Sequence, residues 1–432
     1  MNVRILELLA SKRTANTLWS LAGNVVPALT AILFIPLLIK AMGVELFGLL
    51  TIIWIMIGYF SILDFGLGRS VTLLISQSLG SGRDNDCQRI YSTALPVALL
   101  LGAIACVCLY TLSGYIVNDF LKVSPEAIAE ASLAIAVVSI TLPFAVLSVM
   151  LRGVLESYGD FKGVNVSKLI MGIVTFAGPY WVYVLTESFS WSVVALLIAR
   201  AGLCLSYFLR TLPYIKYRAN EFRSAFLAQL FSVGGWMTVS NLISPLMTYL
   251  DRFFIGGVFS VAIVAYYATP YELVTKLIIF PASLMAVFFP VAAAMLMQDK
   301  KEQLRMQAAK YVQVIFVVMC AALAVVFFGG REILSLWVGE EFSNRSYWVM
   351  VILGVGVVFN AMAQVYFVVL QAAGLSSIPA KIHLCEAPVY IISLLVAVEY
   401  FPFIETVSLV WSGRVLVDFF LMRLFSFKFV GV

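Results

Sequence analysis

Long apolar segments alternate with short polar ones along this chain. A helix that crosses the roughly 30 Å hydrocarbon core of a bilayer needs about 20 mostly apolar residues. Segments of about that length or longer cover residues 16–40, 46–76, 91–118, 127–151, 163–186, 189–211, 226–257, 260–297, 311–338, 347–373, 381–401 and 406–427. The pattern predicts an all-α polytopic membrane protein with about twelve transmembrane helices.

The Lys and Arg residues are distributed unevenly between alternate polar segments. Of the 28 Lys and Arg residues, five lie inside apolar segments and four lie in one set of loops, namely Lys40, Lys122, Arg331 and Arg345. The other 19 lie at the termini and in the opposite set of loops. Because cytoplasmic loops carry an excess of Lys and Arg, this asymmetry predicts that both termini are cytoplasmic.

The predicted spans divide into two groups of six. A short basic linker, residues 213–225, separates the groups, and residues 20, 23 and 40 recur as similar residues at an offset of 212. Parallel-repeat transporters show such a division. The sequence therefore predicts an N-terminal six-helix lobe, residues 1–212, and a C-terminal six-helix lobe, residues 213–432.

Composition excludes several classes of protein. Hydrophobic residues make up 62% of the chain and charged residues 12%, against about 25% charged residues in soluble domains, so no separate soluble domain is expected. The net charge of +5 lies in short loops and does not indicate nucleic-acid binding. No CxxC motif occurs, and His383 is the single histidine, so we predict no metal site and no cofactor. No phosphate-binding P-loop and no nucleophile–His pair is present, so we predict no catalytic residues and no ATP-driven step.

One motif places charges inside a predicted span. It reads Leu63-Asp64-Phe65-Gly66-Leu67-Gly68-Arg69, within the second span. A charge at the centre of a membrane helix costs on the order of 3 kcal/mol, and it persists where it faces protein or water. Asp64 and Arg69 therefore either line a polar cavity or form a structural ion pair.

Two further sets of charges lie inside predicted spans. Arg200 has no acidic neighbour within its own span, so its partner is another helix, water or a ligand. Asp251 and Arg252 are adjacent, and adjacent helical side chains point about 100° apart. We therefore expect each to find a partner elsewhere, or Arg252 to extend to the outer headgroups.

Two pairs have the spacing of neighbours on one helix face. Glu272 and Lys276 are four residues apart, as are Arg414 and Asp418, and this spacing favours an ion pair. Each pair is either a structural pair or part of a functional site. Glu386 lies near a helix end and is expected to be an interfacial carboxylate.

Several stretches resemble a known family. They are Asp64-Phe65-Gly66-Leu67-Gly68-Arg69, Lys40-Ala41-Met42-Gly43, Asp251-Arg252-Phe253-Phe254-Ile255-Gly256, and Arg152-Gly153-Val154-Leu155-Glu156. In these motifs the chain resembles the polysaccharide exporters, or O-antigen flippases. That group belongs to the MOP superfamily, which also holds the multidrug and toxin extrusion (MATE) transporters and the peptidoglycan-precursor flippase.

The resemblance implies a MATE-like fold, with two six-helix lobes around a cationic central cavity. It implies a substrate, an oligosaccharide linked through diphosphate to undecaprenol, which is moved from the cytoplasmic to the outer leaflet of a bacterial inner membrane. It also allows a glycan polymerase and a chain-length regulator as partners. Since a diphosphate in hydrocarbon needs cations to replace its water, the expected substrate-binding residues are Arg69, Arg200, Arg252 and Lys276.

The remaining intramembrane charges are expected to couple an ion or balance charge. These residues are Asp64, Asp251, Glu272, Arg414 and Asp418. The coupling ion is either H⁺ or Na⁺. Two alternative functions stay open: a drug or cation antiporter of the same fold, and a polytopic glycan polymerase or ligase. An acidic cavity would favour the first, and a long external loop would favour the second.

Overall fold

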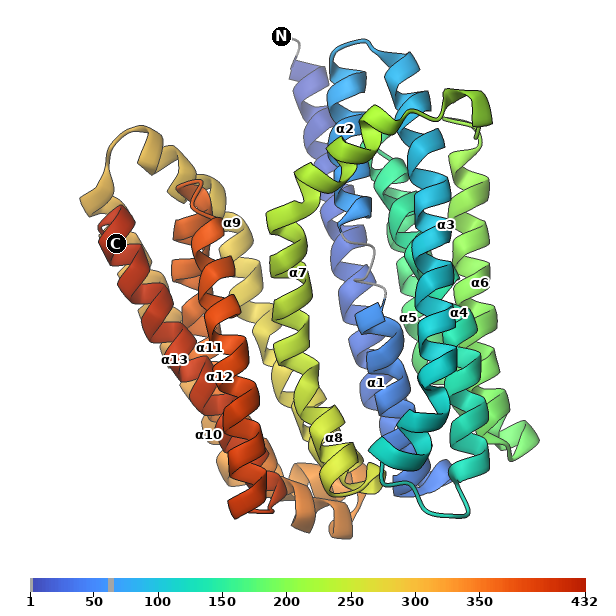
Figure 1. Cartoon of the computed structure of the whole chain (residues 1–432). Helices are drawn as coiled ribbons and strands as arrows, with labels where there is room; N and C mark the ends of the chain where they lie inside the picture. The colour runs from blue at the N-terminus through green and yellow to red at the C-terminus, as the bar shows by residue number, and fades with distance from the viewer. Residues whose placement is uncertain (1–2, 61–65) are drawn as a thin grey trace. The chain divides into compact units, whose positions relative to one another are not determined.

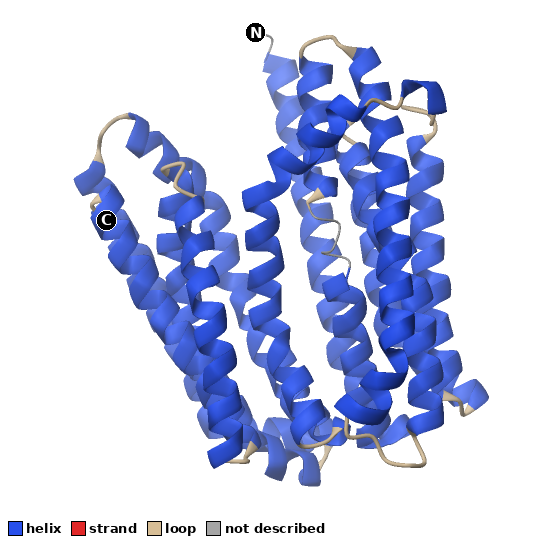
Figure 2. Cartoon of the chain, viewed as in Figure 1, coloured by secondary structure: helices blue, strands red, loops and turns tan. Residues whose placement is uncertain are grey.

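The computed structural model describes the backbone of residues 3–60 and 66–432. It describes the side chains of residues 25–58, 66–230, 247–285, 287–289 and 291–432. Within these ranges the regular elements are all helices (Figure 2). The predicted all-α class is therefore confirmed. Asp64 lies outside the described residues.

The helices form two compact units, Met1–Asn241 and Leu242–Val432 (Figure 1). The first unit contains α1 (Val3–Phe60), α2 (Leu67–Gly80), α3 (Asp84–Tyr115), the π-helix η1 (Ile116–Phe120), α4 (Ile128–Ser157), α5 (Phe161–Thr186), α6 (Phe189–Thr211) and the 3₁₀ turn η2 (Ala219–Glu221). Helix α7 (Ser224–Val258) contains the division. The second unit continues with α8 (Val261–Thr275), the 3₁₀ turn η3 (Lys276–Ile278), α9 (Ile279–Met297), α10 (Lys301–Val338), α11 (Glu340–Ala372), α12 (Ser377–Tyr400) and α13 (Ile404–Val430). The predicted lobe boundary at Pro213 stays a prediction.

Within the described residues, nine segments are long and apolar enough to cross a membrane. They are Val25–Gly58, Asp84–Phe120, Ile128–Ser157, Phe161–Thr186, Phe189–Thr211, Val261–Met297, Lys301–Val338, Glu340–Ala372 and Ser377–Tyr400. The first segment, Val25–Gly58, contains parts of the first and second predicted spans. Helices α7 and α13 correspond to the seventh and twelfth predicted spans. The protein is thus a multi-pass membrane protein, and the count of twelve spans stays a prediction.

Two glycines mark interruptions near the start of the chain. Gly43 has φ 81° and ψ 168° inside α1, a conformation that glycine adopts readily because it has no Cβ. This break lies between the first two predicted spans. Gly66 has φ 74° just before α2 begins. The predicted span 46–76 is therefore wrong as one continuous helix, because Gly66 has this non-helical conformation directly before α2 begins at Leu67.

The central helix of the first unit is α4. It contacts α1, α2, α3, α5 and α6, and more than half of its apolar window is buried, as expected for a helix surrounded by others. Small residues let its neighbours approach closely. A Cβ on Gly153 would lie 2.3 Å from the carbonyl oxygen of Gly68 in α2, and one on Gly102 in α3 would lie 2.7 Å from the Cα of Pro143.

The corresponding helix of the second unit is α11, which contacts α8, α9, α10, α12 and α13. Both α4 and α11 are the fourth predicted span of their half. The apolar window of each is more than half buried, a larger share than in the other seven candidate spans. This equivalence supports the internal repeat that the sequence predicts.

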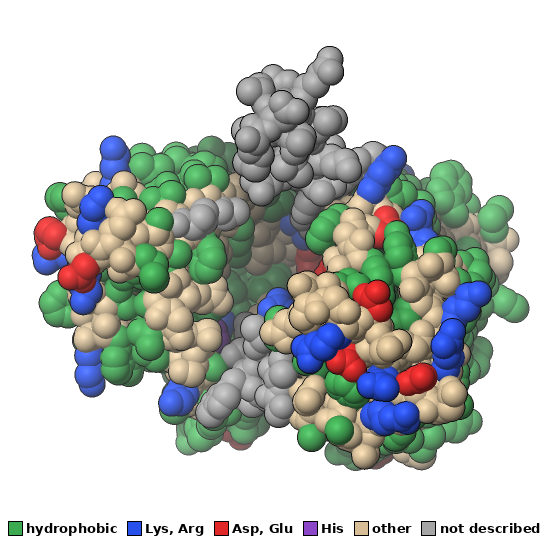
Figure 3. Space-filling view, turned by 90° about the horizontal axis from the view of Figure 1, so that it is seen from above, with side chains coloured by type: hydrophobic (Ala, Val, Ile, Leu, Met, Phe, Trp, Pro, Cys, Tyr) green, Lys and Arg blue, Asp and Glu red, His purple; other side chains and the backbone are tan. Residues whose placement is uncertain are grey.

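Exposed hydrophobic side chains cover much of the described surface. Leu185, Met297, Phe328 and Leu336 are among the most exposed. Figure 3 shows Lys, Arg, Asp and Glu side chains on the end face of the helices, with hydrophobic side chains around its outline. Such a surface is suited to contact with lipid along the flanks of the helices and with water at their ends.

Candidate functional site

The second unit contains a buried charged pair at the C-terminal end of α7. Arg252 is 1% exposed and Asp251 is fully buried. One carboxylate oxygen of Asp251 accepts a hydrogen bond from the hydroxyl of Tyr267 in α8. The other accepts one from the backbone N–H of Arg252 at 2.8 Å. The Asp251 side chain therefore joins α7 to α8.

The Arg252 guanidinium lies between this carboxylate and two aromatic rings. Its Nη1 donates to the carbonyl of Thr248 at 3.1 Å and lies 3.9 Å from Asp251 Oδ1. Its Cζ is 4.1 Å from the ring centre of Tyr271 and 5.4 Å from that of Tyr249. Cation–π contacts stabilise such a desolvated guanidinium by about 2 kcal/mol. The alternative in which Arg252 extends to the headgroups is wrong for this structure.

The expectation that Asp251 and Arg252 do not pair is also wrong. The Asp251 side chain folds back onto the backbone of its own helix, and this brings one of its oxygens towards Nη1 of Arg252. The neighbouring tyrosines, Tyr267 and Tyr271, are buried. They therefore pack in the core around the charged pair.

The predicted Glu272–Lys276 pair is present. Lys276 Nζ donates to Glu272 Oε2 at 2.9 Å, and about a third of each side chain is exposed. Lys276 begins the 3₁₀ turn η3, which interrupts the eighth predicted span between α8 and α9. A positive charge therefore lies at a break in a membrane helix.

The predicted Arg414–Asp418 pair is replaced by contacts between helices. Arg414 Nη1 lies 3.9 Å from Glu386 Oε2 in α12, and its guanidinium lies over the ring of Tyr390 at 5.3 Å. Asp418 Oδ1 lies 3.3 Å from His383 Nε2. Because α12 packs against α13, the facing side chains of α12 compete with the neighbour four residues away.

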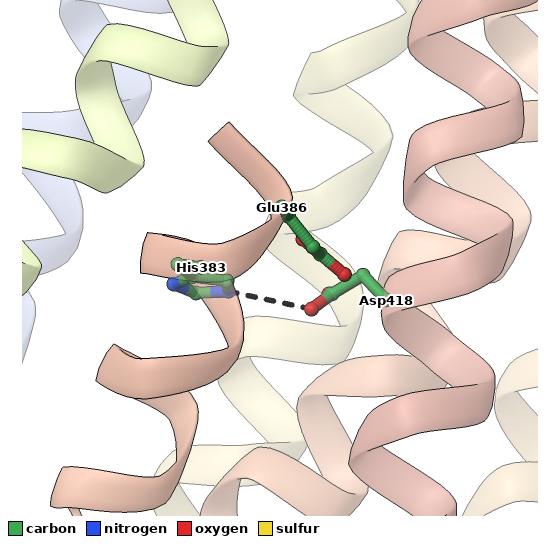
Figure 4. Close-up of side chains that lie close together, drawn as sticks. All are labelled: His383, Glu386 and Asp418. Carbon is green, nitrogen blue, oxygen red and sulfur yellow. Dashed lines mark ion pairs between the residues drawn. The ribbon is translucent and has the colours of Figure 1, made fainter. Parts of the chain in front are cut away.

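Glu386 is a buried residue and not the interfacial carboxylate that the sequence suggested. It is 7% exposed, as is Asp418. Figure 4 shows His383 and Glu386 on one helix, with Asp418 on the facing helix. One sequence feature could have indicated this group. His383 and Glu386 are three residues apart, and this spacing places both on one face of a helix.

A polar cavity of about 190 Å³ adjoins this group. His383, Arg414 and Asp418 line it together with Asn360 and Gln364 of α11. A water molecule occupies about 30 Å³ in the liquid, so the cavity has room for several. The His383, Glu386 and Asp418 ligand atoms lie within 4.8 Å of one another, close enough to share one small cation.

The first unit holds the other two predicted substrate-binding residues. Arg69 is exposed, near the N-terminal end of α2. Next to it, the Thr72 hydroxyl lies 3.0 Å from the carbonyl of Gly68 and 3.2 Å from that of Gly153. Two motifs that are distant in the sequence, around Gly68 and Gly153, therefore pack against each other.

Arg200 lies in α6 and is partly buried. Its Nε atom is enclosed and has no hydrogen-bond partner among the described residues. Its guanidinium therefore retains donor capacity for water or an anion. The expectation that its partner is another helix, water or a ligand stays a prediction.

Comparisons with known proteins identify relatives across most of the chain. A family model described as "Polysaccharide biosynthesis protein" matches residues 38–347. A Shigella flexneri protein named "Putative O-antigen transporter" is 32% identical over 412 residues, which cover 94% of this chain and 96% of that protein. A Bacillus subtilis protein named "Uncharacterized membrane protein EpsK" is 20% identical over 366 residues, which cover 83% of this chain and 71% of that protein.

Solved structures define the fold. The structure described as the inward-facing conformation of a multidrug resistance MATE family transporter of the MOP superfamily superposes with a TM-score of 0.80. The match has 15% sequence identity and covers 96% of this chain and 94% of that one. The chain therefore has the MATE-like fold that its motifs indicate.

Proposed function

The chain belongs to the polysaccharide biosynthesis protein family, and we propose that it moves lipid-linked oligosaccharides across the membrane. The proposed substrate is an O-antigen-type repeat unit on undecaprenyl diphosphate, and the proposed path runs from the cytoplasmic to the outer leaflet of a bacterial inner membrane. The observation that carries this proposal is the 32% identity to a protein named as an O-antigen transporter over 94% of the chain. Both termini would then be cytoplasmic.

The charged residues at helix breaks support this proposal. In transporters, interrupted helices at equivalent positions of two repeats mark the substrate site. The second predicted span of each half is interrupted, at Gly66 in one half and at Lys276–Ile278 in the other. Arg69 and Lys276 lie at or just beyond these breaks. We propose that they replace part of the water around the substrate diphosphate.

Arg200 and Arg252 would contribute differently. We propose that Arg200 binds an anionic group of the substrate, because its enclosed Nε has no hydrogen-bond partner among the described residues. Arg252 is enclosed by Asp251, Tyr249 and Tyr271. We propose that it reaches the substrate only in a state where the Tyr271 ring has moved aside.

The acidic residues inside the spans would couple transport to an ion gradient. We propose this role for Asp251, Glu272 and Asp418 of the second unit, with Arg414 balancing their charge, and for Asp64, which lies outside the described residues. A neighbouring Arg or Lys lowers the affinity of a buried carboxylate for a proton or another cation, so a bound ion can be released again.

A drug antiporter of the same fold is the second candidate, because the solved neighbour with a TM-score of 0.80 is a multidrug transporter. Cationic drugs would require an excess of acidic groups along the path. The five Lys and Arg residues inside the predicted spans support an anionic substrate instead. We propose no catalytic residues, and a glycan polymerase and a chain-length regulator would act on the exported repeat.

The experiment compares lipid-linked sugars in a deletion strain and its parent. If the protein is the flippase, complete repeat units accumulate and an external glycan-cleaving enzyme does not reach them. If it is a polymerase, single repeats still reach the outer leaflet and only chain length is lost. Full external access in the deletion strain would refute the flippase proposal.

A further inference from the structure

Two buried carboxylates face each other between α12 and α13. Glu386 and Asp418 are each 7% exposed, and the carboxylate of Glu386 points towards that of Asp418 (Figure 4). His383 Nε2 lies on the other side of Asp418, 3.3 Å from Oδ1. Burying two like charges this close is unfavourable unless a cation or a proton lies between them.

Three of the four oxygens of these carboxylates also lack a hydrogen-bond partner among the described residues. Neither oxygen of Glu386 has a hydrogen-bond partner among the described residues, and neither does Oδ1 of Asp418. A buried polar atom left unpaired costs about 1–3 kcal/mol, and more when it is charged. Three such atoms in one place indicate that the group normally holds something else.

The charges around the group define how much positive charge it needs. Arg414 of α13 contributes one positive charge, at 3.9 Å from Glu386. Glu386 and Asp418 contribute two negative charges, and His383 is neutral or positive. The net charge with neutral His383 is −1, so one further positive charge makes the group neutral.

Among the described residues that line the cavity, Arg414 is the only Lys or Arg. From α11, the cavity is lined by the uncharged Asn360 and Gln364, and from α7 by Thr248 and Met247. Asp251 of α7 and Tyr390 of α12 are titratable groups that interact electrostatically with Arg414. Asp251 is already held by Arg252 and by the hydroxyl of Tyr267 of α8. Glu272 of α8 is paired with Lys276.

We propose that His383, Glu386 and Asp418 form a binding site for one exchangeable proton, which deepens and rests on the proposed ion-coupled transport. A divalent metal ion would give this group, with Arg414 included, a net charge of +1. Sodium prefers a shell of oxygen atoms, as other hard cations do, whereas one member of this group offers an imidazole nitrogen. A proton satisfies both the charge and the donor types.

The cavity next to the group provides a route for exchange. His383, Arg414 and Asp418 line its 190 Å³, and water in it can carry a proton to the group. On binding, hydronium transfers one proton to the group and leaves one water molecule. On release, water takes that proton back, so no oxidant or other reactant is needed.

The single histidine makes the test direct. Purified protein labelled with ¹⁵N-histidine and freed of any tag gives ring signals from His383 alone, since the chain has one His. We expect these signals to change with pH over the neutral range, about pH 5 to 8. A parallel titration counts the protons bound by the wild type, by Glu386→Gln and by Asp418→Asn. Each variant is neutral without the extra proton, so each should bind one proton fewer per chain.

Matched controls and competing ions complete the experiment. Glu399→Gln removes an exposed carboxylate from the same helix, α12, and should leave the His383 signals unchanged. If Glu386→Gln does not fold, Asp418→Asn and the wild-type titration still test the site. Adding Na⁺ or Zn²⁺ at fixed pH should not displace the proton. Displacement by either ion, or an unchanged proton count in both variants, would overturn the assignment.

The outcome is separate from the proposed flippase function. The proton count and the His383 signals are measured on purified protein without substrate. Sugar accumulation in the deletion strain is measured in cells. Normal proton binding together with full external access to the sugar would refute the flippase proposal and retain the site. An unchanged proton count in both variants, together with trapped sugar in the deletion strain, would refute the site alone.

Discussion

Replacing Gly153 tests the close contact between α2 and α4. A Cβ at this position would lie 2.3 Å from the carbonyl oxygen of Gly68 and 2.9 Å from the hydroxyl oxygen of Thr72. The first of these atoms belongs to the backbone, so the contact is relieved only by moving α2. Overpacking of this kind costs about 1–3 kcal/mol.

Two other terms decide the net effect of Gly153→Ala. Ala is favoured over Gly in a helix by about 1 kcal/mol, which opposes the clash. Separating α2 from α4 also weakens the contact between Thr72 and the carbonyl of Gly153, and such bonds between membrane helices contribute about 0.6 kcal/mol. We therefore expect a net loss of about 1–2 kcal/mol in the free energy of unfolding.

Gly202→Ala is the matched control. Gly202 is exposed in α6, and a Cβ there would have no neighbour within 4 Å. This variant should gain up to about 1 kcal/mol from helix propensity alone. The assay is denaturant unfolding of the purified protein in one detergent, with both variants measured beside the wild type. A Gly153→Ala protein as stable as Gly202→Ala would refute the close contact. Because α2 carries Arg69, we also expect Gly153→Ala to lower export.

Three further predictions follow from the charged residues. Asp251→Ala should cost about 3–5 kcal/mol in unfolding free energy, because it leaves the buried Arg252 guanidinium without its carboxylate; a loss below about 1 kcal/mol in the same detergent assay would show that the pair is solvated. Arg200→Ala should reduce export of lipid-linked repeats more than Arg200→Lys, since Lys retains the charge and loses the planar fork; equal export from both variants would remove Arg200 from the site. In intact cells an impermeant thiol reagent should label Glu341→Cys and not Ser81→Cys, although both positions are exposed, because the loop at Glu341 is predicted to face outwards; labelling of both without permeabilisation would contradict the predicted topology.

Local sequence spacing predicted much of this protein. Apolar segments of about 20 residues form helices in a membrane because each backbone N–H and C=O must be satisfied within its own segment. Glu272 and Lys276 pair as their spacing predicts. Gly43 breaks α1 between the first two predicted spans, and the family motifs indicate the MATE-like fold.

Only the tertiary structure decided which side chains share a site. The partner of Arg414 is Glu386 and the partner of Asp418 is His383, although the sequence places Arg414 and Asp418 four residues apart. Gly68 and Gly153 meet across two helices, and Arg252 is buried instead of extending to the headgroups. Spacing along a helix defines which residues share a face, whereas the rotation of that face towards a neighbour depends on how all the helices pack. For this reason the candidate proton site, which needs two facing helices, is visible only in the folded chain.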